Sequence, residues 1–330
     1  MIISRTPFRI SFFGGGTDYP DYFRANGGEV LSTSINKYCY ISTRKLPPFF
    51  EHKFRVAYSR IEMTSSVEEI EHPSVRNVLK WLNVEAGTEI QHIGDLPARS
   101  GIGSSSSFTV GLLNALYAQQ GRYIGKEQLA TQAIHVEQDL IGEPVGSQDQ
   151  IAAAYGGLNH IEFLIDGSFK VSPIIVKADL RSRLESSLMM YFTGVTRMSS
   201  DYSSAKIRNI SRRETELAHM RRLVADALHI LRKDDGDLDD FGRLLHENWQ
   251  LKKTLSDKVT SPHLEEIYDT AIAAGALGGK LMGAGGGGFF VFYVPPERQG
   301  SVKQALSKLV HVPFQFDNDG SSIIVYQPED

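Results

Sequence analysis

The residues of clearest chemical use form a segment rich in glycine and serine, which runs from Asp95 to Ser107. It lies between an extended run, residues 88–93, and an apolar run typical of a helix, residues 108–118. When a strand, a tight turn and the start of a helix follow one another, several backbone N–H groups and the positive end of the helix dipole point to one place, which favours a phosphate. No Gly-Lys-Ser/Thr follows at the spacing of a Walker A loop. A flexible linker is the alternative, but linkers are rarely bounded so closely by a proline and an apolar helix.

A carboxylate falls on the apolar face of a second predicted helix, residues 126–141. Apolar side chains recur there at helical spacing, and Glu137 lies three or four positions from Ala133, Ile134 and Leu140. An inward carboxylate is costly unless a cation compensates it or a proton neutralises it. A divalent metal would compensate it, and a structural ion pair with a buried Arg or Lys is the alternative.

Asp149 lies at the end of a loop that leads into an apolar helix expected from near Gln150. A carboxylate just before a helix is often only its N-cap. Together with Glu137, however, it offers one carboxylate for a metal and another for a hydroxyl proton.

Two further glycine-rich segments are candidate binding sites. Residues 14–16 are three glycines, and Thr17 and Asp18 follow them with acceptors suited to polyol hydroxyls. A hairpin turn with an Asx-type hydrogen bond is the alternative. Residues 285–288 are four successive glycines, each unfavourable by about 0.5–1 kcal/mol relative to alanine. Since a plain turn needs only one or two, we favour close approach of a ligand to this backbone.

The elements that must position these residues alternate between strands and helices, which predicts an α+β fold with a boundary in residues 177–200. The expected strands are residues 9–13, 30–35, 38–43, 54–58, 88–93, 158–163, 171–176, 187–193, 289–294, about 312–316 and 323–326. The expected helices are residues 73–82, 105–119, 126–141, one from near 150, then 203–233, 241–255, 264–274 and 298–309.

Size and composition exclude several classes of protein. A chain of 330 residues is long for one core, so we expect two domains. The formal net charge of −4 gives no general attraction to nucleic acid or to anionic membranes, and we expect neither as a partner. No apolar run approaches the roughly 18 residues of a membrane span, and charged residues come too early for a signal peptide. The single cysteine, Cys39, is expected to be a buried free thiol of a cytoplasmic protein, and a homodimer is compatible with the sequence.

In their order along the chain, these segments resemble the three motifs of the GHMP kinase superfamily, named for galactokinase, homoserine kinase, mevalonate kinase and phosphomevalonate kinase. The resemblance covers nearly the whole chain and implies a two-domain α+β fold. Residues 1–183 would form a domain like the second domain of ribosomal protein S5, and residues 184–330 a ferredoxin-like domain. The Phe13-Gly-Gly-Gly-Thr-Asp18 form of the first motif is similar to that of the sugar-1-kinase branch, and most of all to its heptose 7-phosphate kinases.

The resemblance implies ATP and Mg²⁺ as cofactors and gives each motif a role. The residues around the ATP phosphates would be Pro97, Arg99, Ser100, Gly101, Ile102, Gly103, Ser104, Ser105 and Ser106, the last in place of the usual alanine. The Mg²⁺ ligands would be Ser105 and Glu137. Asp149 would be the catalytic base, with Arg9 beside it favouring its ionised form. The substrate contacts would be Gly14, Gly15, Gly16, Thr17, Asp18, Gly285 and Gly286, with Arg197, otherwise a surface residue, as a weaker candidate for a second sugar phosphate.

The implied activity is transfer of the ATP γ-phosphoryl group to the anomeric hydroxyl of D-glycero-D-manno-heptose 7-phosphate, for nucleotide-activated heptose and surface-polysaccharide synthesis. A hexose 1-kinase similar to fucokinase or galactokinase is the alternative. An ATP-dependent decarboxylase of the same superfamily is disfavoured by the sugar-type first motif. An inactive nucleotide-binding homologue is disfavoured because Ser105, Glu137 and Asp149 are all present.

Overall fold

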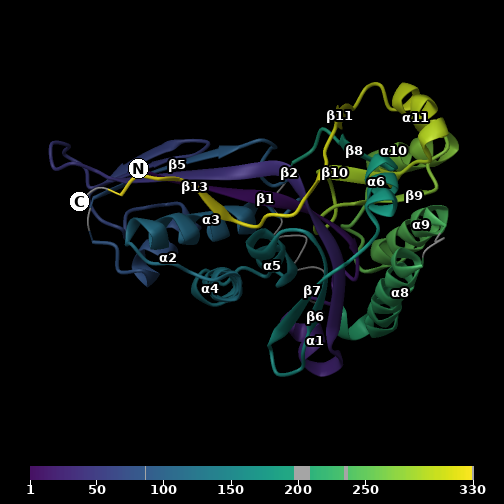
Figure 1. Cartoon of the computed structure of the whole chain (residues 1–330), viewed down its shortest axis with the longest axis horizontal. Helices are drawn as coiled ribbons and strands as arrows, with labels where there is room; N and C mark the ends of the chain where they lie inside the picture. Colours follow the sequence, from purple (N-terminus) through teal and green to yellow (C-terminus); the bar gives the residue numbers. More distant parts are fainter. Residues whose placement is uncertain (86, 197–208, 234–236, 329–330) are drawn as a thin grey trace.

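Figure 1 shows the computed structural model of the chain, which describes residues 1–85, 87–196, 209–233 and 237–328. Two long antiparallel strands, β1 (Ile2–Phe13) and β2 (Gly28–Lys45), form the centre of the molecule. Both are rich in β-branched and aromatic residues, which suit a pleated, buried surface. Residues 6–13 of β1 are all buried, because helices from both halves of the chain pack against this strand. Cys39 on β2 is a buried free thiol, as expected, and burial raises its pKa.

The first sheet has nine strands in the part of the chain that the structure describes. The main order is β13 (Ser322–Tyr326), β1, β2, β5 (Thr88–Gly94), β3 (Phe54–Ala57) and β4 (Ile61–Thr64). Off this path, β6 (Leu158–Phe163) pairs with β2 and with β7 (Phe169–Pro173), while β12 (Phe316–Asp317) pairs with β2. The last strands therefore return to the first sheet, which the sequence did not reveal. The expected division at residue 183 stays a prediction that does not account for this return.

Helices of the first half lie together below the first sheet in Figure 1. They are α2 (Pro73–Trp81), α3 (Ser104–Gln119), α4 (Lys126–His135) and α5 (Gln148–Tyr155), with the short α1 (Pro20–Asn26) further along the sheet. The central helix of this layer, α3, is apolar around most of its circumference, and residues 106–113 are all buried. Such a helix has to lie inside a core.

The second half of the chain forms an antiparallel four-stranded sheet, with the order β11 (Val310–Val312), β8 (Leu188–Phe192), β10 (Phe289–Tyr293) and β9 (Gly278–Leu281). Its helices are α6 (Ala178–Ser186), α8 (Glu214–Arg232), α9 (Leu238–Thr254), α10 (Pro262–Ala273) and α11 (Gln299–Ala305), with short 3₁₀ turns η2 (Ile210–Arg212) and η3 (Pro296–Arg298). No helix in the described ranges is long and apolar enough to cross a bilayer.

Aromatic packing joins the two halves at the end of β1. The ring of Phe12 meets Phe241 of α9 edge to face at 5.3 Å, and the ring of Phe13 meets Phe241 at 5.1 Å. The backbone carbonyl of Phe12 also accepts hydrogen bonds from Asn248 of α9 (3.1 Å) and Lys280 of β9 (2.9 Å). The glycines that follow Phe13 are thereby held at the junction of the two halves.

The expected elements are largely present, with four main differences. The strand expected at about 312–316 is split into β11 and β12, which belong to different sheets. The two expected strands at residues 30–35 and 38–43 are one strand, β2. The helix expected over residues 126–141 changes at Val136 into a π-helical turn, η1 (Val136–Leu140). The prediction of a long helix from residue 203 was wrong for residues 209–213, which are described and precede the start of α8 at Glu214. There, Ile210 is in a 3₁₀ turn and packs with Tyr19 and Tyr22, so a tertiary contact outweighs helical periodicity.

The junction yields a stability prediction. Phe241→Ala should lower the free energy of unfolding by about 3–5 kcal/mol, because it removes a fully buried ring and leaves a cavity between the halves. Urea unfolding followed by circular dichroism measures this loss. Phe49→Ala is the matched control, since that ring is 90% exposed. Equal stability of the two variants would contradict the proposed role of the junction.

Candidate active site

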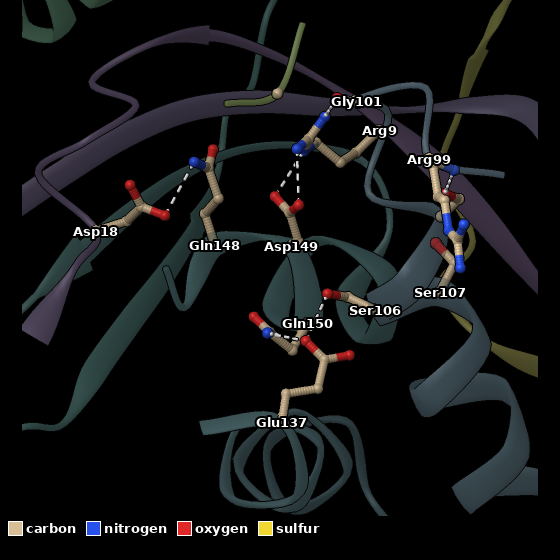
Figure 2. Close-up of polar contacts among 12 residues, drawn as sticks. Arg9, Asp18, Arg99, Gly101, Ser106, Ser107, Glu137, Gln148, Asp149 and Gln150 are labelled. Atoms are coloured by element: carbon tan, nitrogen blue, oxygen red, sulfur yellow. Dashed lines mark hydrogen bonds and ion pairs between the residues drawn. The ribbon is translucent and has the colours of Figure 1, made fainter. Parts of the chain in front are cut away.

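Three consecutive side chains at the start of α5 contact three different parts of the candidate site (Figure 2). Gln148 donates from Nε2 to Asp18 Oδ2 at 2.9 Å. Asp149 is paired with Arg9, and Gln150 donates from Nε2 to Glu137 Oε2 at 2.5 Å. Successive residues of a helix point about 100° apart, so one turn of α5 can reach the first motif, the predicted base and the inward carboxylate.

The pair of Asp149 and Arg9 is bidentate. Arg9 Nε donates to Asp149 Oδ1 at 2.8 Å, and Nη2 donates to Oδ2 at 2.7 Å. The Arg9 side chain is only 3% exposed, whereas that of Asp149 is 25% exposed, so an acceptor molecule can reach the carboxylate. The N-cap of α5 is Ser147, which rules out the alternative that Asp149 is a helix cap. Parallel N–H···O bonds of this kind fix a carboxylate in position as well as neutralising its charge.

Arg9 also connects the predicted base to the predicted ATP loop. Its Nη1 donates to the carbonyl of Gly101 at 2.7 Å, and its backbone N–H donates to the carbonyl of Ile102 at 3.1 Å. A Cβ on Gly103 would lie 3.3 Å from Arg9 Cγ and 3.5 Å from Asp149 Oδ2. The loop and the base are therefore in direct contact.

The loop itself has the strand–turn–helix form expected from the sequence. It follows β5, ends at Gly103 with φ of 76°, and leads into α3 at Ser104. Ser100 Oγ donates to the carbonyl of Pro97 at 2.6 Å, and the backbone of Arg99, with φ of 60°, donates to Ser104 Oγ at 3.2 Å. These bonds and the buried side chain of Ile102 give the loop a defined shape, so it is not a flexible linker. The start of a helix of 16 residues faces the loop, as a phosphate site requires.

Glu137 is buried, as its helical position predicted, with 1% exposure. Its Oε2 accepts hydrogen bonds from Gln150 and from Ser106 Oγ, the latter at 2.9 Å. Burial raises the pKa of this carboxyl to about 7. It lies in the π-helical turn η1, a local geometry that is frequent at functional sites.

The hydroxyl that contacts Glu137 belongs to Ser106 and not to Ser105, which is exposed. Helix α3 begins at Ser104, so its first turn directs these neighbouring side chains to different sides. The predicted role of Ser105 as a metal ligand stays a prediction. Ser106, the residue in place of the usual alanine, is the one whose hydroxyl donates to Glu137.

The oxygens around Glu137 fit Mg²⁺. Glu137 Oε1 and Gln150 Oε1 are buried and have no hydrogen-bond partner within the described residues. Mg²⁺ prefers oxygen ligands and is usually held by one or two carboxylates together with substrate phosphates. In the described ranges, no group of three or more His, Cys, Asp or Glu residues could hold a metal by itself. The residues present therefore suit an ion shared with a nucleotide.

The third glycine-rich segment lies directly on the predicted ATP loop. A Cβ on Gly283 would be 2.5 Å from Gly101 Cα, and one on Gly288 would be 2.1 Å from the carbonyl oxygen of Ser100. From α9, Lys252 donates to the carbonyl of Gly283 at 2.7 Å. Two segments far apart in the sequence thus meet backbone to backbone.

This packing corrects our interpretation of the four successive glycines. A Cβ on Gly285 would be 2.6 Å from Val259 Cα, and the backbone of Gly286 donates to the carbonyl of Val259 at 2.7 Å. A Cβ on Gly287 would be 2.9 Å from the carbonyl oxygen of Val195. Close approach does require these glycines, but the approaching group is the protein's own backbone. The geometry provides no support for Gly285 and Gly286 as substrate contacts.

The first motif contains both structural and candidate binding residues. Thr17 is fully buried, and its hydroxyl lies within hydrogen-bonding distance of the carbonyls of Gly14 (2.8 Å) and Glu29 (2.9 Å). It also accepts the N–H of Glu29 at 3.0 Å, which leaves it no proton for a sugar. Asp18 accepts the N–H of Gly16 at 2.7 Å and the amide of Gln148, so it faces α5. Asp18 is as buried as Thr17, at 1% exposure, so the geometry gives neither residue direct support as a sugar contact, and both stay predictions.

One predicted site residue, Arg197, lies outside the described residues. Gln148 and Gln150 are functional candidates that the sequence analysis missed. The sequence shows that they flank Asp149. Which residues they contact, Asp18 and Glu137, depends on the rotation of α5 about its axis, which the sequence does not reveal.

Comparison with known proteins identifies the family. The GHMP kinases N terminal domain family matches residues 71–157, and the GHMP kinases C terminal family matches residues 224–312. The chain is 30% identical over 320 residues to a D-glycero-alpha-D-manno-heptose 7-phosphate kinase of Campylobacter jejuni, and the alignment covers 93% of each chain. The chain belongs to the GHMP kinase family. The expected α+β GHMP kinase fold, the phosphotransferase class and, with them, the use of ATP are confirmed.

Solved structures agree with this assignment. A D-glycero-D-manno-heptose 1-phosphate kinase from Bacteroides thetaiotaomicron superposes on this GHMP kinase with a TM-score of 0.79 at 28% identity, covering 97% of this chain and 98% of the other. A galactokinase of Lactococcus lactis complexed with galactose has a TM-score of 0.72 at 19% identity, covering 97% and 94%. The latter likeness shows the fold alone.

The raised pKa of Glu137 predicts a pH-dependent need for metal. Below its pKa of about 7, the carboxyl of the folded kinase carries a proton that Mg²⁺ must displace. The Mg²⁺ concentration for half-maximal rate should therefore fall, by up to tenfold per pH unit, as the pH rises from about 6 to about 7, and then level off. Initial rates over a series of Mg²⁺ concentrations at each pH measure this.

Glu137→Gln should raise the Mg²⁺ requirement and remove this pH dependence, whereas Glu127→Gln, at an exposed position of α4, should change neither. An unaltered metal requirement in Glu137→Gln would mean that this carboxyl is only structural.

Proposed function

We propose that this GHMP kinase transfers the γ-phosphoryl group of ATP to the anomeric hydroxyl of D-glycero-D-manno-heptose 7-phosphate. The observation that carries the proposal is the contact chain from the carboxylate of Asp149 through the guanidinium of Arg9 to the carbonyl of Gly101. It sets a candidate base at a fixed place beside a candidate phosphate loop. The relatives named above, one a heptose 7-phosphate kinase and one a heptose 1-phosphate kinase, support a heptose phosphate as the sugar.

The chemistry needs little more than position and charge. Phosphoryl transfer passes through a loose transition state, so orienting the two reactants and neutralising charge supply most of the catalysis. The backbone N–H groups of the loop and the start of α3 would bind the phosphates. Glu137, with Ser105 or Ser106, would hold Mg²⁺, which neutralises phosphate charge when bound.

Asp149 would accept the proton of the attacking hydroxyl late in the reaction. An anomeric hydroxyl is more acidic than an ordinary alcohol, so a carboxylate base suffices. Each oxygen of Asp149 accepts one bond from Arg9 and has a further lone pair for the substrate. Arg9 keeps the carboxylate oriented while that proton moves.

The position of the transferred group is part of the proposal. The names of the two heptose kinases above specify the 7-phosphate and the 1-phosphate respectively. Transfer of the γ-phosphoryl group to the anomeric hydroxyl of a heptose 7-phosphate, with release of ADP and of the hydroxyl proton, would give a heptose 1,7-bisphosphate and would account for both names. Such a product would serve the synthesis of a nucleotide-activated heptose for surface polysaccharides.

A panel of acceptors tests the proposed substrate. D-glycero-D-manno-heptose 7-phosphate, free heptose, L-fucose, galactose and mannose are each supplied with ATP and Mg²⁺, and ADP release is measured. The heptose 7-phosphate should give the highest kcat/KM, and ³¹P NMR of the product should show a second phosphate on the anomeric carbon. A higher kcat/KM for fucose or galactose would instead establish the hexose 1-kinase alternative. Carbon dioxide release from diphosphomevalonate would establish a decarboxylase. The absence of turnover with any of these compounds would establish an inactive homologue.

Replacing the candidate base tests its role. Asp149→Asn should lower kcat by about 10²–10⁴-fold, because the amide cannot accept the proton. The dissociation constant for ATP should change little, since the loop and Glu137 remain. Stopped-assay rates and nucleotide titration by calorimetry measure the two quantities. Asp139→Asn, at an exposed carboxylate on η1, is the matched control and should behave as the wild type. A kcat within a few-fold of wild type in Asp149→Asn would remove the assignment.

A further inference from the structure

A cavity of about 530 Å³ lies at the far end of α5 from the candidate base. The end of α5 with the turn after it, residues 155–159, forms one wall, and residues 173–176, where the chain leaves β7 (Figure 1), form another. Lys126 of α4, Arg181 of α6 and Asn318 also line it, and none of the described candidate residues for ATP, metal or acceptor does. We call this space the α5 cavity. Its volume is that of an ordinary small-molecule site, about 300–1,000 Å³.

The charged side chains that line the α5 cavity are positive. Lys126 and Arg181 line it, whereas no aspartate or glutamate in the described ranges does. Neither of these cations forms an ion pair with a carboxylate within the same ranges. Arg183, two residues further along α6 and outside the lining, does pair with Asp179. Cations without a carboxylate beside a cavity favour an anionic ligand, and ammonium and guanidinium groups both suit phosphate.

Both cations are held in place by the protein. Lys126 Nζ donates to the backbone carbonyl of Tyr155, the last residue of α5, at 2.7 Å. The guanidinium carbon of Arg181 lies 5.9 Å from the centre of the Phe316 ring, within the range of a cation–π contact. An ammonium has three N–H donors and a guanidinium five, so these contacts leave donors for a ligand. Side chains oriented in advance also lose less entropy when a ligand binds.

The rest of the lining is mostly apolar. It includes Leu158, Val171, Ile174 and Ile175, and the exposed amide of Asn318 lies among them. Ile175 is 90% exposed, so a ligand that covers it gains free energy by removing apolar surface from water. An inorganic phosphate has no apolar part for this wall, and a lipid phosphate has no group for the amide. A nucleoside phosphate has a flat base, hydroxyls and phosphate, which together match all three kinds of surface.

We propose that the α5 cavity binds a nucleoside phosphate, free or linked to a sugar, at a site separate from the candidate ATP loop. The base lies on the apolar wall formed by Leu158 and Ile175, the phosphate contacts Lys126 and Arg181, and the amide of Asn318 bonds a hydroxyl or the edge of the base. This inference goes beyond phosphoryl transfer, and it does not depend on which sugar is the acceptor.

Titration calorimetry with the ATP site occupied tests the proposal. The kinase is first saturated with Mg²⁺ and the non-hydrolysable ATP analogue AMPPNP, and then titrated with GDP, UDP, GDP-mannose and UDP-glucose. At least one of the four should bind at a single site with a Kd below about 1 mM, and inorganic phosphate should bind at least about tenfold more weakly. The free nucleotides and the nucleotide sugars distinguish the two sources of the same chemistry. No saturable binding of any of the four up to about 5 mM would overturn the proposal, as would equally tight binding of inorganic phosphate.

A charge placed at the rim tests the site without disturbing the core. Ile175→Asp should weaken nucleotide binding about tenfold, because the new carboxylate repels a phosphate. Ile175→Asn, similar in shape but neutral, should bind more tightly than Ile175→Asp. Ile165→Asp is the matched control, since that side chain is 64% exposed, lies between β6 and β7, and is outside the lining. A wild-type Kd in Ile175→Asp would overturn the proposal.

Removal of a cation tests the phosphate contact. Arg181→Gln should weaken nucleotide binding about tenfold, because it removes a charged hydrogen-bond donor. Arg183→Gln, on the same helix but outside the lining, should keep the wild-type Kd. Thermal unfolding of both variants is measured alongside, since Arg181→Gln also loses the contact with Phe316. Equal Kd values for the two folded variants would contradict the assigned contact, and if Arg181→Gln does not fold, Ile175→Asp decides.

Discussion

The candidate site depends on the ion pair between Arg9 and Asp149. A guanidinium that is 3% exposed has lost most of its hydration, so it needs a carboxylate and carbonyls close by. Asp149 supplies the carboxylate, and Gly101 supplies a carbonyl. Because Arg9 lies on β1, Gly101 in the loop before α3, and Asp149 on α5, satisfying one buried charge brings three elements to fixed positions. The candidate base is thereby both oriented and tied to the candidate phosphate loop.

Close backbone contact extends this arrangement to the second half of the chain. Gly283 and Gly288 approach Gly101 and Ser100 so nearly that no side chain could be accommodated. Buried amines of α9 and β9 support the same region, with Lys252 on the carbonyl of Gly283 and Lys280 on that of Phe12. The glycines at 283 and 288 thus permit close backbone packing, and the candidate phosphate loop is stabilised from both halves.

The two candidate carboxylates differ in burial, and this difference suits them to different roles. Glu137 is in the interior, where desolvation raises its pKa to about 7. Its Oε1 has no hydrogen-bond partner in the part of the chain that the structure describes, which suits an ion brought in with a nucleotide. Asp149, one quarter exposed and paired with an arginine, faces the place where an acceptor can enter. The side chains of Gln148 and Gln150 connect these environments through a single turn of α5.

The sequence alone determined the features that depend on local periodicity and composition. The apolar stripe around Glu137 predicted its burial, and the residue types around Gly101 predicted a strand, a tight turn and the start of a helix, because each pattern lies within one short segment. Only the tertiary structure decided the contacts across elements. These are Ser106 rather than Ser105 on Glu137, Gln148 on Asp18, and Val259 rather than a ligand beside Gly285. Such choices depend on the rotation of α3 and α5 and on how separate segments of the second half pack. No pattern within a single segment encodes them, since each is set by packing between different elements, as for Gln148 and Asp18, which are 130 positions apart.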